Sequence, residues 1–466
     1  MGRYIAVDLG AESGRVILGT LDDGRLALEE LHRFANEPVR LPGGLYWDVP
    51  RLWLEIQRGL AVAGRGRGLR VDGVGVCTWG VDFALLARDG TLAALPRHYR
   101  DPANAGMIER IGERIPRRRL YERTGVQFLQ INSLPQLYSM KLAGAPGLEI
   151  ASKLIFMPDL FAYFLSGEAK AERTIASTSQ FYNPSTGDWA REVFEELGLP
   201  PGILPEIAAP GTRLGGLRAE VAGEVGLAAG TPVYATAGHD TAAAVAAAPA
   251  RGDAPWCYIS SGTWSLMGVE RDAPVLTRRA EELNFTNEAG VGGKIRLLKN
   301  IMGLWPLQEC RRAWQAAGRE YSYAELTAMA AAAPEFPATI DVDEFLEPGH
   351  MPERIAAACA RSGQREPSTP AEFTRLILQS LAAKYEEVLA KAEELTGERT
   401  AAIHIVGGGS RNRLLNELVE KRTGRAVAAG PVEATAAGNI LTQALGAGEV
   451  PDLARMREIV RGSGLS

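Results

Sequence analysis

The sequence RYIAVDLGAESGRVIL, residues 3–18, places a short apolar strand before an Asp and a Gly/Ser turn, and a second apolar strand after the turn. The first strand is expected to bring Asp8 to the edge of a sheet. The glycines of the turn let the backbone approach an anion closely, and Ser13, Arg15 and the turn amides can donate to phosphate oxygens. The stretch therefore predicts a hairpin that faces phosphate and metal, although similar turns also join strands in ordinary hairpins.

The composition is that of a globular protein of two domains. A chain of 466 residues is too long for one ordinary core, and 46% of it is hydrophobic. The formal net charge of −5 argues against nucleic acid as a partner, and no apolar run is long enough to span a membrane. We expect a cytoplasmic protein whose four scattered cysteines are reduced and buried. The triplet Arg117–Arg119 is interpreted as the solvated face of a helix.

The second half of the chain repeats the plan of the N-terminus. Alternating strand and helix patterns in the first half, with a helix expected from Val49 to Ala63, indicate an α/β layered domain. After Pro249, residues 256–259 form a strand pattern that enters a polar Gly turn, and residues 264–269 form the next strand. We therefore predict two domains built alike, at residues 1–248 and 249–466.

A glycine cluster follows a strand near the end of the chain. Apolar residues at spacings of three and four predict one long helix from Pro370, closed by Gly397. Residues 402–406 then form a buried strand that enters Gly407–Ser410, and a helical pattern runs from 412 to 423. A strand, a glycine turn and a helix in this order commonly seat a nucleotide. The alternative is a helix-entry loop without a function.

No P-loop or protein-kinase signature occurs, so a nucleotide would be bound in another way. Two hairpins with polar turns, a strand-terminal Asp and the glycine cluster suggest the two-domain architecture of sugar kinases and heat-shock ATPases. The motifs then become specific: the chain resembles the FGGY family of carbohydrate kinases from residue 4 to about 445. The motifs that carry the resemblance are IAVDLGAESGR (5–15), TWGVDF (78–83), HDTA (239–242), SSGTWSLM (260–267), LKNIMGLW (298–305) and IVGGG (405–409).

The resemblance implies two ribonuclease-H-like α/β domains of the actin, hexokinase and heat-shock ATPase superfamily, with an active site in the cleft between them. It also implies transfer of phosphate from ATP, with Mg²⁺, to a small sugar. Among the family's substrates, the motifs favour L-rhamnulose, phosphorylated at its 1-hydroxyl. L-fuculose, D-xylulose or another polyol is the alternative, and a nucleotide-binding regulator without a sugar substrate is a more distant one.

The resemblance places the sugar site on residues from several motifs. Asp240 is the candidate general base, because a carboxylate can orient the acceptor hydroxyl and take its proton. The alternative for Asp240 is a helix N-cap, and the alternative for the Gly80 and Asp82 segment is a plain β-turn. Trp79 could stack on a sugar face or lie buried. The expected substrate-binding residues are Gly80, Asp82, His239, Asp240, Thr241 and Asn300.

The resemblance also implies a nucleotide site. Gly408 would leave room for adenine or ribose, Thr263 would meet the phosphates, and Gln308 is expected on the same helix as Asn300. Asp8 should hold Mg²⁺ through water. At Glu12 the sequence departs from the family's small residue, and its carboxylate is expected to repel phosphate or to attract Mg²⁺. The expected ATP-binding residues are Ala11, Glu12, Ser13, Gly14, Arg15, Thr263, Gln308 and Gly408.

Overall fold

The computed structural model describes residues 1–252 and 254–465. The chain forms two compact units. Met1–Pro249, Glu270–Leu297 and Ala434–Leu465 make up the first unit, and Ala250–Val269 with Leu298–Glu433 make up the second. The C-terminal segment therefore belongs to the first unit.

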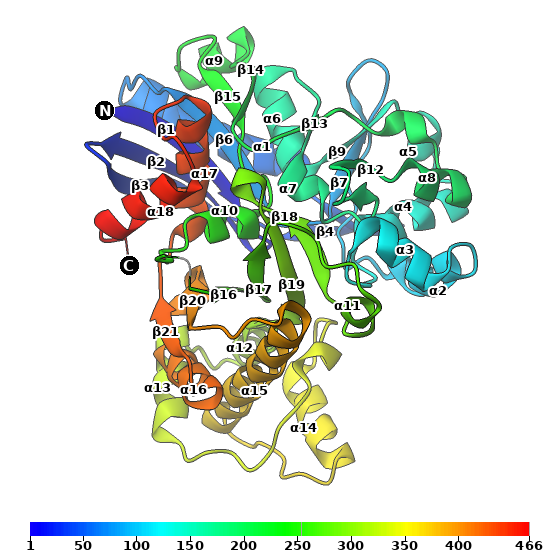
Figure 1. Ribbon diagram of the computed structural model, residues 1–466, viewed down its shortest axis with the longest axis vertical. Coiled ribbons are helices and arrows are strands. Elements are labelled where there is room, and N and C mark those ends of the chain that lie inside the picture. Colours follow the sequence, from blue (N-terminus) through cyan, green and yellow to red (C-terminus); the bar gives the residue numbers. More distant parts are fainter. Residues whose placement is uncertain (253, 466) are drawn as a thin grey trace. The chain divides into compact units, whose positions relative to one another are not determined.

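A six-stranded sheet of order β14-β15-β6-β1-β2-β3 is the centre of the first unit (Figure 1). Strands β1, β2 and β3 are antiparallel neighbours, whereas β1, β6 and β15 run parallel. The predicted N-terminal hairpin is confirmed, and its first strand is almost entirely buried because its residues are apolar on both faces. The strands are β1 (Gly2–Leu9), β2 (Ser13–Asp22), β3 (Arg25–Ala35), β6 (Gly73–Thr78), β14 (Thr212–Gly216) and β15 (Pro232–Ala235).

Helices from distant parts of the sequence cover this sheet. The helix α17 (Ala434–Gly446) packs on β1 and β6, where Gln443 Nε2 donates to the Ile5 carbonyl over 2.9 Å. The predicted helix after Val49 is confirmed as α1 (Val49–Ala61), which packs on β2 and β3. The other α-helices of the first unit are α2 (Met107–Gly112), α3 (Arg117–Thr124), α4 (Ser133–Leu142), α5 (Pro146–Glu149), α6 (Met157–Ser166), α7 (Arg173–Ala176), α8 (Arg191–Leu197), α9 (Ala219–Val225), α10 (Asp240–Ala246), α11 (Arg278–Glu282) and α18 (Leu453–Gly462).

Short strands lie outside the two large sheets. Strands β8, β7 and β9 form a three-stranded sheet, and three pairs of strands form two-stranded sheets. These strands are β4 (Pro38–Leu41), β5 (Gly44–Trp47), β7 (Phe83–Leu86), β8 (Leu92–Ala94), β9 (Lys153–Phe156), β10 (Ala171–Glu172), β11 (Tyr182–Asn183), β12 (Asp188–Trp189) and β13 (Ile207–Ala208).

The second six-stranded sheet, of order β18-β19-β17-β16-β20-β21, follows the same plan as the first. An antiparallel hairpin, β16 with β17, is again extended by parallel strands, here β20 and β21. The predicted repetition of strand, polar turn and strand is therefore confirmed. The strands are β16 (Trp256–Ser261), β17 (Trp264–Arg271), β18 (Thr286–Ala289), β19 (Ile295–Met302), β20 (Ala402–Val406) and β21 (Ala426–Ala429).

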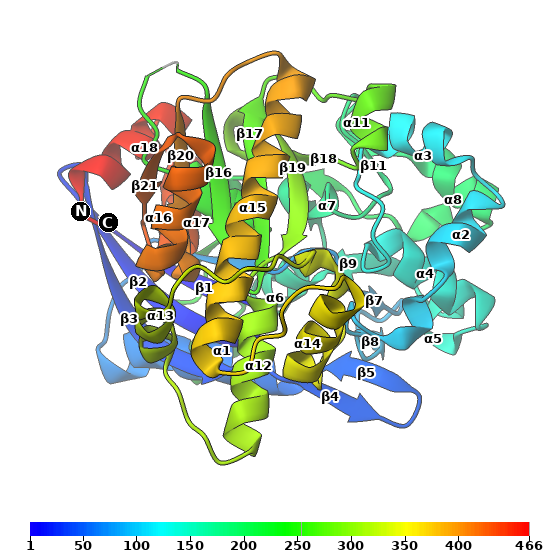
Figure 2. The ribbon, with the colours of Figure 1, turned by 90° about the horizontal axis from the view of Figure 1, so that it is seen from below.

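The long predicted helix is α15 (Pro370–Thr396), which packs against α12, α13 and α16 (Figure 2). Thr369 caps its first turn, Pro370 takes the first helical position, and Gly397 ends it in the left-handed conformation at φ +69°. Tyr385 anchors it to β17 through a 2.6 Å hydrogen bond with Ser265. The neighbouring helices are α12 (Trp305–Ala316), α13 (Tyr323–Ala332), α14 (Met351–Arg361) and α16 (Arg413–Thr423).

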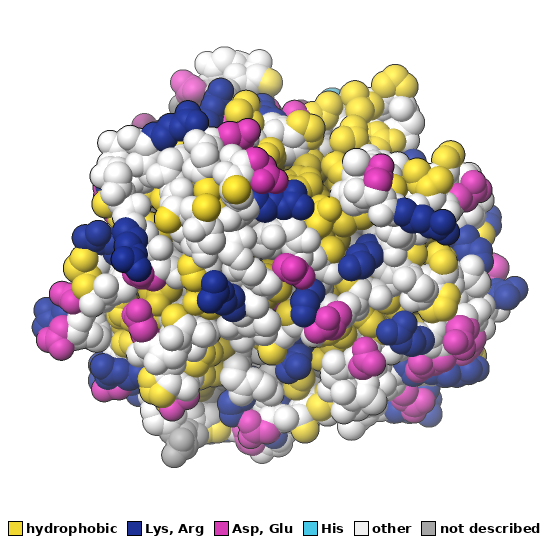
Figure 3. All heavy atoms as spheres, turned by 90° about the horizontal axis from the view of Figure 1, so that it is seen from above, with side chains coloured by type: hydrophobic (Ala, Val, Ile, Leu, Met, Phe, Trp, Pro, Cys, Tyr) yellow, Lys and Arg dark blue, Asp and Glu magenta, His cyan; other side chains and the backbone are white. Residues whose placement is uncertain are grey.

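The basic triplet of α3 lies at the surface, and the cysteines lie inside the protein. Arg117–Arg119 begin α3 and pair with Glu281, Glu122 and Glu196, so the predicted solvated helix face is confirmed. The face in Figure 3 carries Lys and Arg side chains interspersed with Asp and Glu. The four cysteines are free and buried, as predicted. Among the described residues, no helix has the length and apolar character needed to cross a membrane.

Candidate active site

Three parallel strands of the first unit bring the site residues together, because their carboxyl ends meet at one edge of the sheet. Asp8 lies near the end of β1, and Thr78 ends β6. After β15 the chain reaches His239, which forms an isolated parallel bridge with Thr78. The Thr78 amide also donates to the Gly238 carbonyl over 2.8 Å. A strand-terminal Asp and the His239-Asp240 pair therefore lie at the same edge.

Asp240 is the first residue of α10, and the N-cap position belongs to His239, so the structure contradicts the alternative of Asp240 as an N-cap. Its Oδ1 accepts from the Thr241 amide at 2.6 Å and from the Thr241 hydroxyl at 3.2 Å. Within residues 1–252 and 254–465, no hydrogen bond engages its Oδ2. The side chain keeps 29% of its surface exposed. Asp240 therefore presents one held oxygen and one free oxygen, the geometry that a general base needs.

The electrostatic surroundings of Asp240 favour proton uptake. Burial raises the pKa of Asp240, the His239 side chain opposes this rise, and the negative charge of Asp8 adds to it. A carboxylate with a raised pKa binds a proton more readily than an ordinary Asp. Because the charge of Asp8 acts on Asp240, the two carboxylates lie close to each other.

Buried polar groups on and before α7 hold the backbone that leads into Asp240. The Gly238 amide donates to Glu172 Oε2 over 2.8 Å, and the His239 amide donates to the Thr174 hydroxyl over 3.2 Å. A Cβ on Gly238 would lie 2.9 Å from the same Glu172 oxygen, so only glycine fits there. The backbone at Gly238 and His239 is thus held in place directly before α10 begins.

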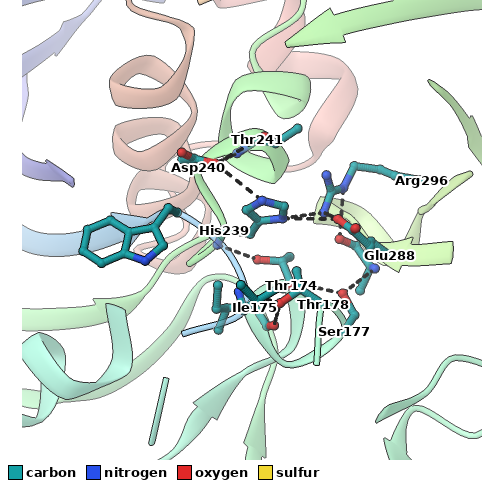
Figure 4. A network of polar contacts seen from close by, with 12 residues as sticks. Thr174, Ile175, Ser177, Thr178, His239, Asp240, Thr241, Glu288 and Arg296 are labelled. Atoms are coloured by element: carbon teal, nitrogen blue, oxygen red, sulfur yellow. Dashed lines mark hydrogen bonds and ion pairs between the residues drawn. The ribbon is translucent and has the colours of Figure 1, made fainter. Parts of the chain in front are cut away.

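The His239 ring is held from the opposite side (Figure 4). Arg296 Nη2 lies 3.2 Å from His239 Nδ1, and Glu288 Oε2 lies 3.3 Å from the same nitrogen. Nε2, the other ring nitrogen, lies 3.5 Å from Asp240 Oδ1. All three partners are side chains of the first unit, so the ring bridges Asp240 to a buried ion pair.

The Asp82 side chain is fully buried and faces protein donors. Its Oδ2 accepts from the indoles of Trp47 and Trp79 at 2.6 and 2.9 Å, and its Oδ1 accepts from the Gln136 amide at 2.9 Å. Burial raises the pKa of Asp82 to about 7 in spite of these donors. Trp79 is itself 5% exposed. Asp82 thus orients two indoles in this structure, and its contact with sugar remains a prediction.

Gly80 lies against the His239 side chain. A Cβ on Gly80 would lie 3.4 Å from His239 Nε2. The next residue, Val81, has φ +67°, a strained conformation for a β-branched side chain. Its amide donates to the Thr178 hydroxyl over 3.1 Å, and its carbonyl accepts from the Ser133 hydroxyl at 2.5 Å. These bonds hold a strained turn beside His239, as is common in binding sites.

The polar turn of the N-terminal hairpin is braced by Asn36, which sequence reasoning missed. The Gly10 amide donates to the Ser13 carbonyl over 2.9 Å and closes the turn. Asn36 Nδ2 donates to the Gly10 carbonyl over 2.8 Å, and the Asn36 amide donates to the Glu12 carbonyl over 3.0 Å. The turn from Gly10 to Ser13, which includes Ala11, is therefore held in a fixed shape.

Two residues of this hairpin have roles that the sequence did not suggest. A Cβ on Gly14 would lie 2.3 Å from the Phe34 ring, so core packing requires this glycine. Arg15 pairs with Asp8, its neighbour across the β1–β2 pairing. Both residues remain candidates for ATP binding, Gly14 through its backbone and Arg15 through its remaining donors.

In the second unit, the three glycines after β20 have different roles. Gly407 has φ +83°, which favours glycine. A Cβ on Gly409 would lie 2.1 Å from the Ser261 hydroxyl, so Gly409 packs on β16. Around Gly408 a Cβ would meet no described atom within 4 Å. Gly408 is therefore the member of the cluster that leaves open space for a ligand, as its predicted role requires.

Thr263 lies in the turn between β16 and β17, which is the second polar hairpin turn. Its carbonyl accepts from the amides of Gly303 at 3.1 Å and Trp305 at 3.3 Å. Asn300 lies on β19 and Gln308 on α12, so the expectation that they share one helix is wrong. The helix begins only at Trp305, because Asn300 belongs to the apolar strand that precedes Gly303. The Gln308 Oε1 atom is buried, and no residue that the structure describes makes a hydrogen bond to it.

Among the residues that sequence reasoning missed, Arg296 left the clearest signal. It interrupts the apolar strand Ile295–Leu298, and a charge within a buried strand needs a partner. Glu172, Thr174 and Glu288 left no comparable signal, because single polar residues at the ends of short elements are common.

Known proteins match the chain along nearly its whole length. The N-terminal domain of the FGGY family of carbohydrate kinases matches residues 3–247, and its C-terminal domain matches residues 257–447. A rhamnulokinase of Bacteroides thetaiotaomicron is 44% identical over 459 residues, covering 98% of this chain and 93% of that protein. A rhamnulokinase of Oceanobacillus iheyensis is 38% identical over 461 residues, covering 98% and 96%.

Solved structures of sugar kinases share the fold. A gluconate kinase of Lactobacillus acidophilus has a TM-score of 0.79 at 14% identity, covering 98% of this chain and 92% of that one. A xylulose kinase of Rhodospirillum rubrum has a TM-score of 0.77 at 19% identity with the same coverage. The predicted two-domain fold of the actin and hexokinase type is thereby confirmed. The chain belongs to the FGGY family of carbohydrate kinases.

Proposed function

We propose that this chain transfers the γ-phosphate of ATP to the 1-hydroxyl of L-rhamnulose, giving L-rhamnulose 1-phosphate and ADP. The observation that carries the proposal is Asp240, whose Oδ1 is held by Thr241 while its Oδ2 has no hydrogen bond within the described part of the chain. The identity of 38–44% to rhamnulokinases along nearly the whole chain supports the choice of sugar.

The proposed reaction uses Asp240 as the general base. Its Oδ2 accepts the proton of the sugar hydroxyl as the oxygen bonds to the γ-phosphorus and the bond to the β-phosphate oxygen breaks. His239 and Thr241 would hydrogen-bond the sugar or keep the carboxylate in place. Gly80 would let the sugar approach the His239 ring.

The nucleotide would be held by residues from both polar hairpins and the glycine cluster. Backbone amides of the turn at Ala11–Ser13 and of Gly14 would donate to phosphate oxygens, as would Thr263. Glu12 would stand at the rim of this phosphate site. The open space at Gly408 would take adenine or ribose, with Gln308 as a further contact and Asn300 on the sugar side.

The residues present fit the Mg²⁺ that such a reaction uses. Mg²⁺ takes one or two carboxylates and otherwise keeps water and phosphate oxygens. Asp8 provides such a carboxylate, and its negative charge contributes to the raised pKa of Asp240. Among the described residues, no three His, Cys, Asp or Glu side chains form a protein-built cage. Asp8 would therefore hold the ion through water, and the ion would offset the phosphate charge.

Coupled ADP release with Mg-ATP tests the proposed substrate. We expect the highest kcat/KM with L-rhamnulose in a panel that also contains L-fuculose, D-xylulose, L-ribulose and glycerol. A reaction without sugar measures background ATP hydrolysis. Preference for another member of the panel would refute the choice of L-rhamnulose, and turnover independent of sugar would refute the kinase reaction.

A further inference from the structure

Arg296 is the most unusual buried charge of the first unit. Its side chain is 0% exposed, and Nη1 has no hydrogen-bond partner among the described residues. Burying a guanidinium is costly, and an unpaired buried donor adds to the cost. An apolar side chain of similar size would stabilise the core more than this arginine does. We therefore infer the role of Arg296 from the groups that its other nitrogens contact.

One nitrogen of Arg296 has two acceptors. Nη2 lies 3.0 Å from Glu288 Oε2 and 3.2 Å from His239 Nδ1. This nitrogen carries two hydrogens, so each acceptor can take one. The Glu288 carboxylate lies 3.0 Å from Arg296 Nη2 and pairs with the charge of the buried guanidinium.

His239 Nδ1 lies between a donor, Arg296 Nη2 at 3.2 Å, and an acceptor, Glu288 Oε2 at 3.3 Å. Because Nη2 can donate to Glu288 and to Nδ1 at once, the shorter contact makes Nδ1 the second acceptor of Arg296, and the ring proton is then on Nε2. We propose that Arg296, supported by Glu288, is a positioning residue of the sugar kinase reaction, which fixes His239 with its proton on Nε2 and directed at Asp240.

This arrangement has a consequence for the base. His239 Nε2 lies 3.5 Å from Asp240 Oδ1, the oxygen that also accepts from Thr241. A proton on Nε2 attracts that oxygen, whereas a lone pair on Nε2 would repel it. Oδ1 is thereby fixed, and Oδ2 is left for the substrate proton. Only the expected effect on kcat depends on the proposed function; the position of the proton does not.

The proton position can be measured by ¹⁵N NMR on the full-length protein with labelled histidine. The chain has five histidines, and a His239→Gln variant identifies the signals of residue 239. We expect a neutral ring protonated at Nε2, without any sugar or nucleotide. A ring protonated at Nδ1, or at both nitrogens, at neutral pH would overturn the proposal.

Variants separate Arg296 from its neighbours. In Arg296→Met the donor is lost, and Nδ1 should take the proton and donate to Glu288, which lies 3.3 Å away. We expect a loss of kcat of at least tenfold with the KM for ATP within twofold of wild type. In Glu288→Gln the amide oxygen can still accept from Arg296, so the Nε2 proton should remain.

Arg457→Met is the matched control, because Arg457 is an arginine of the same unit whose side chain is only 13% exposed and pairs with Glu270 at 2.5 Å. It should leave the His239 signals unchanged. Should Glu288→Gln move the proton while Arg296→Met does not, Glu288 would set the tautomer and the proposal would be wrong. The wild-type spectrum tests the position of the His239 proton even if the Arg296 variant does not fold.

Discussion

At the scale of single residues, Asp240 has the most direct expected effect on catalysis. Asp240→Asn keeps an oxygen for the Thr241 bonds but removes the proton acceptor, so kcat should fall by about 10²–10⁴-fold. ATP affinity, measured by titration calorimetry, should stay close to that of wild type. Asp89→Asn, which alters an exposed Asp whose side chain accepts from Thr91 within its own turn, is the control. A variant that keeps most of its turnover would refute the assignment of the base.

Asp82 should make folding stability depend on pH. The pKa of Asp82 is about 7 in the folded protein against an ordinary value of 3.8, and burial is the largest cause. Between these values the folded state binds a proton that the unfolded state has lost. The free energy of unfolding contributed by Asp82 therefore decreases as the pH rises, by on the order of 3 kcal/mol between pH 5 and pH 8.

Urea unfolding at pH 5 and pH 8 measures this effect. Asp82→Asn has no such titration, although its NH2 group would face a donor, either the indoles or the Gln136 amide, and lower stability at both pH values. The stability of wild type relative to the variant should thus decline from pH 5 to pH 8. A difference that does not change with pH would mean that Asp82 is ionised throughout.

At the scale of elements, the approach of α17 to α10 couples packing to the site. A Cβ on Gly438 of α17 would lie 1.9 Å from the Ala243 carbonyl oxygen of α10. Alanine in a helix is normally favoured over glycine by about 1 kcal/mol. Here Gly438→Ala should instead lower the free energy of unfolding by about 1–3 kcal/mol, because the helices must separate. Since α10 begins at Asp240, kcat should fall as well.

Gly223→Ala is the control for this prediction. Gly223 lies within α9, and a Cβ there would meet no described atom within 4 Å. This substitution should stabilise the protein by up to about 1 kcal/mol and leave kcat unchanged. Urea unfolding and steady-state kinetics measure both variants. Equal stabilisation by both substitutions would contradict the close approach of α17 and α10.

The elements also indicate what the sequence could and could not predict. Periodic apolar residues with local caps were sufficient for α15 and for the β20–α16 connection, because these signals lie within the segments themselves. The packing of α17 on β1 was not predictable, since it joins Gln443 to Ile5 across 438 positions. An amphipathic pattern shows that a helix is buried on one side but not which strand it covers.

For the site, local motifs predicted which residues lie in turns but not what their side chains face. The sequence correctly placed Asp240 between a strand and a helix and Gly408 after a strand, and the structure makes Asp240 the first residue of α10. For Asp82, a carboxylate between apolar residues is compatible with a sugar and with indoles, and the structure has the indoles of Trp47 and Trp79. Side-chain direction depends on neighbours that come from other segments.

At the scale of the whole molecule, the two units should respond differently to the two substrates. The candidate sugar residues Gly80 and His239–Thr241 belong to the first unit, and Gly408 and Thr263 belong to the second. A ligand slows amide exchange where it binds, and it stabilises the folded state by about 2.7 kcal/mol at a concentration of 100 times Kd. L-rhamnulose alone should therefore protect peptides of the first unit that contain Gly80 or His239.

A non-hydrolysable ATP analogue should protect a different set of peptides. We expect slower exchange at Thr263, at Gly408 and at the turn from Ala11 to Ser13, because these are the candidate phosphate and nucleotide groups. Hydrogen exchange with mass spectrometry measures both ligands on the same protein, and glycerol at equal concentration is the control for the sugar. Protection at Gly408 by the sugar alone, or at Gly80 by the nucleotide alone, would contradict the division of roles. Because Asp240 would meet the sugar and Asp8 the metal-bound phosphates, the peptide that contains Asp240 is expected to respond to the sugar and the peptide that contains Asp8 to the nucleotide with Mg²⁺, even though the two carboxylates interact electrostatically.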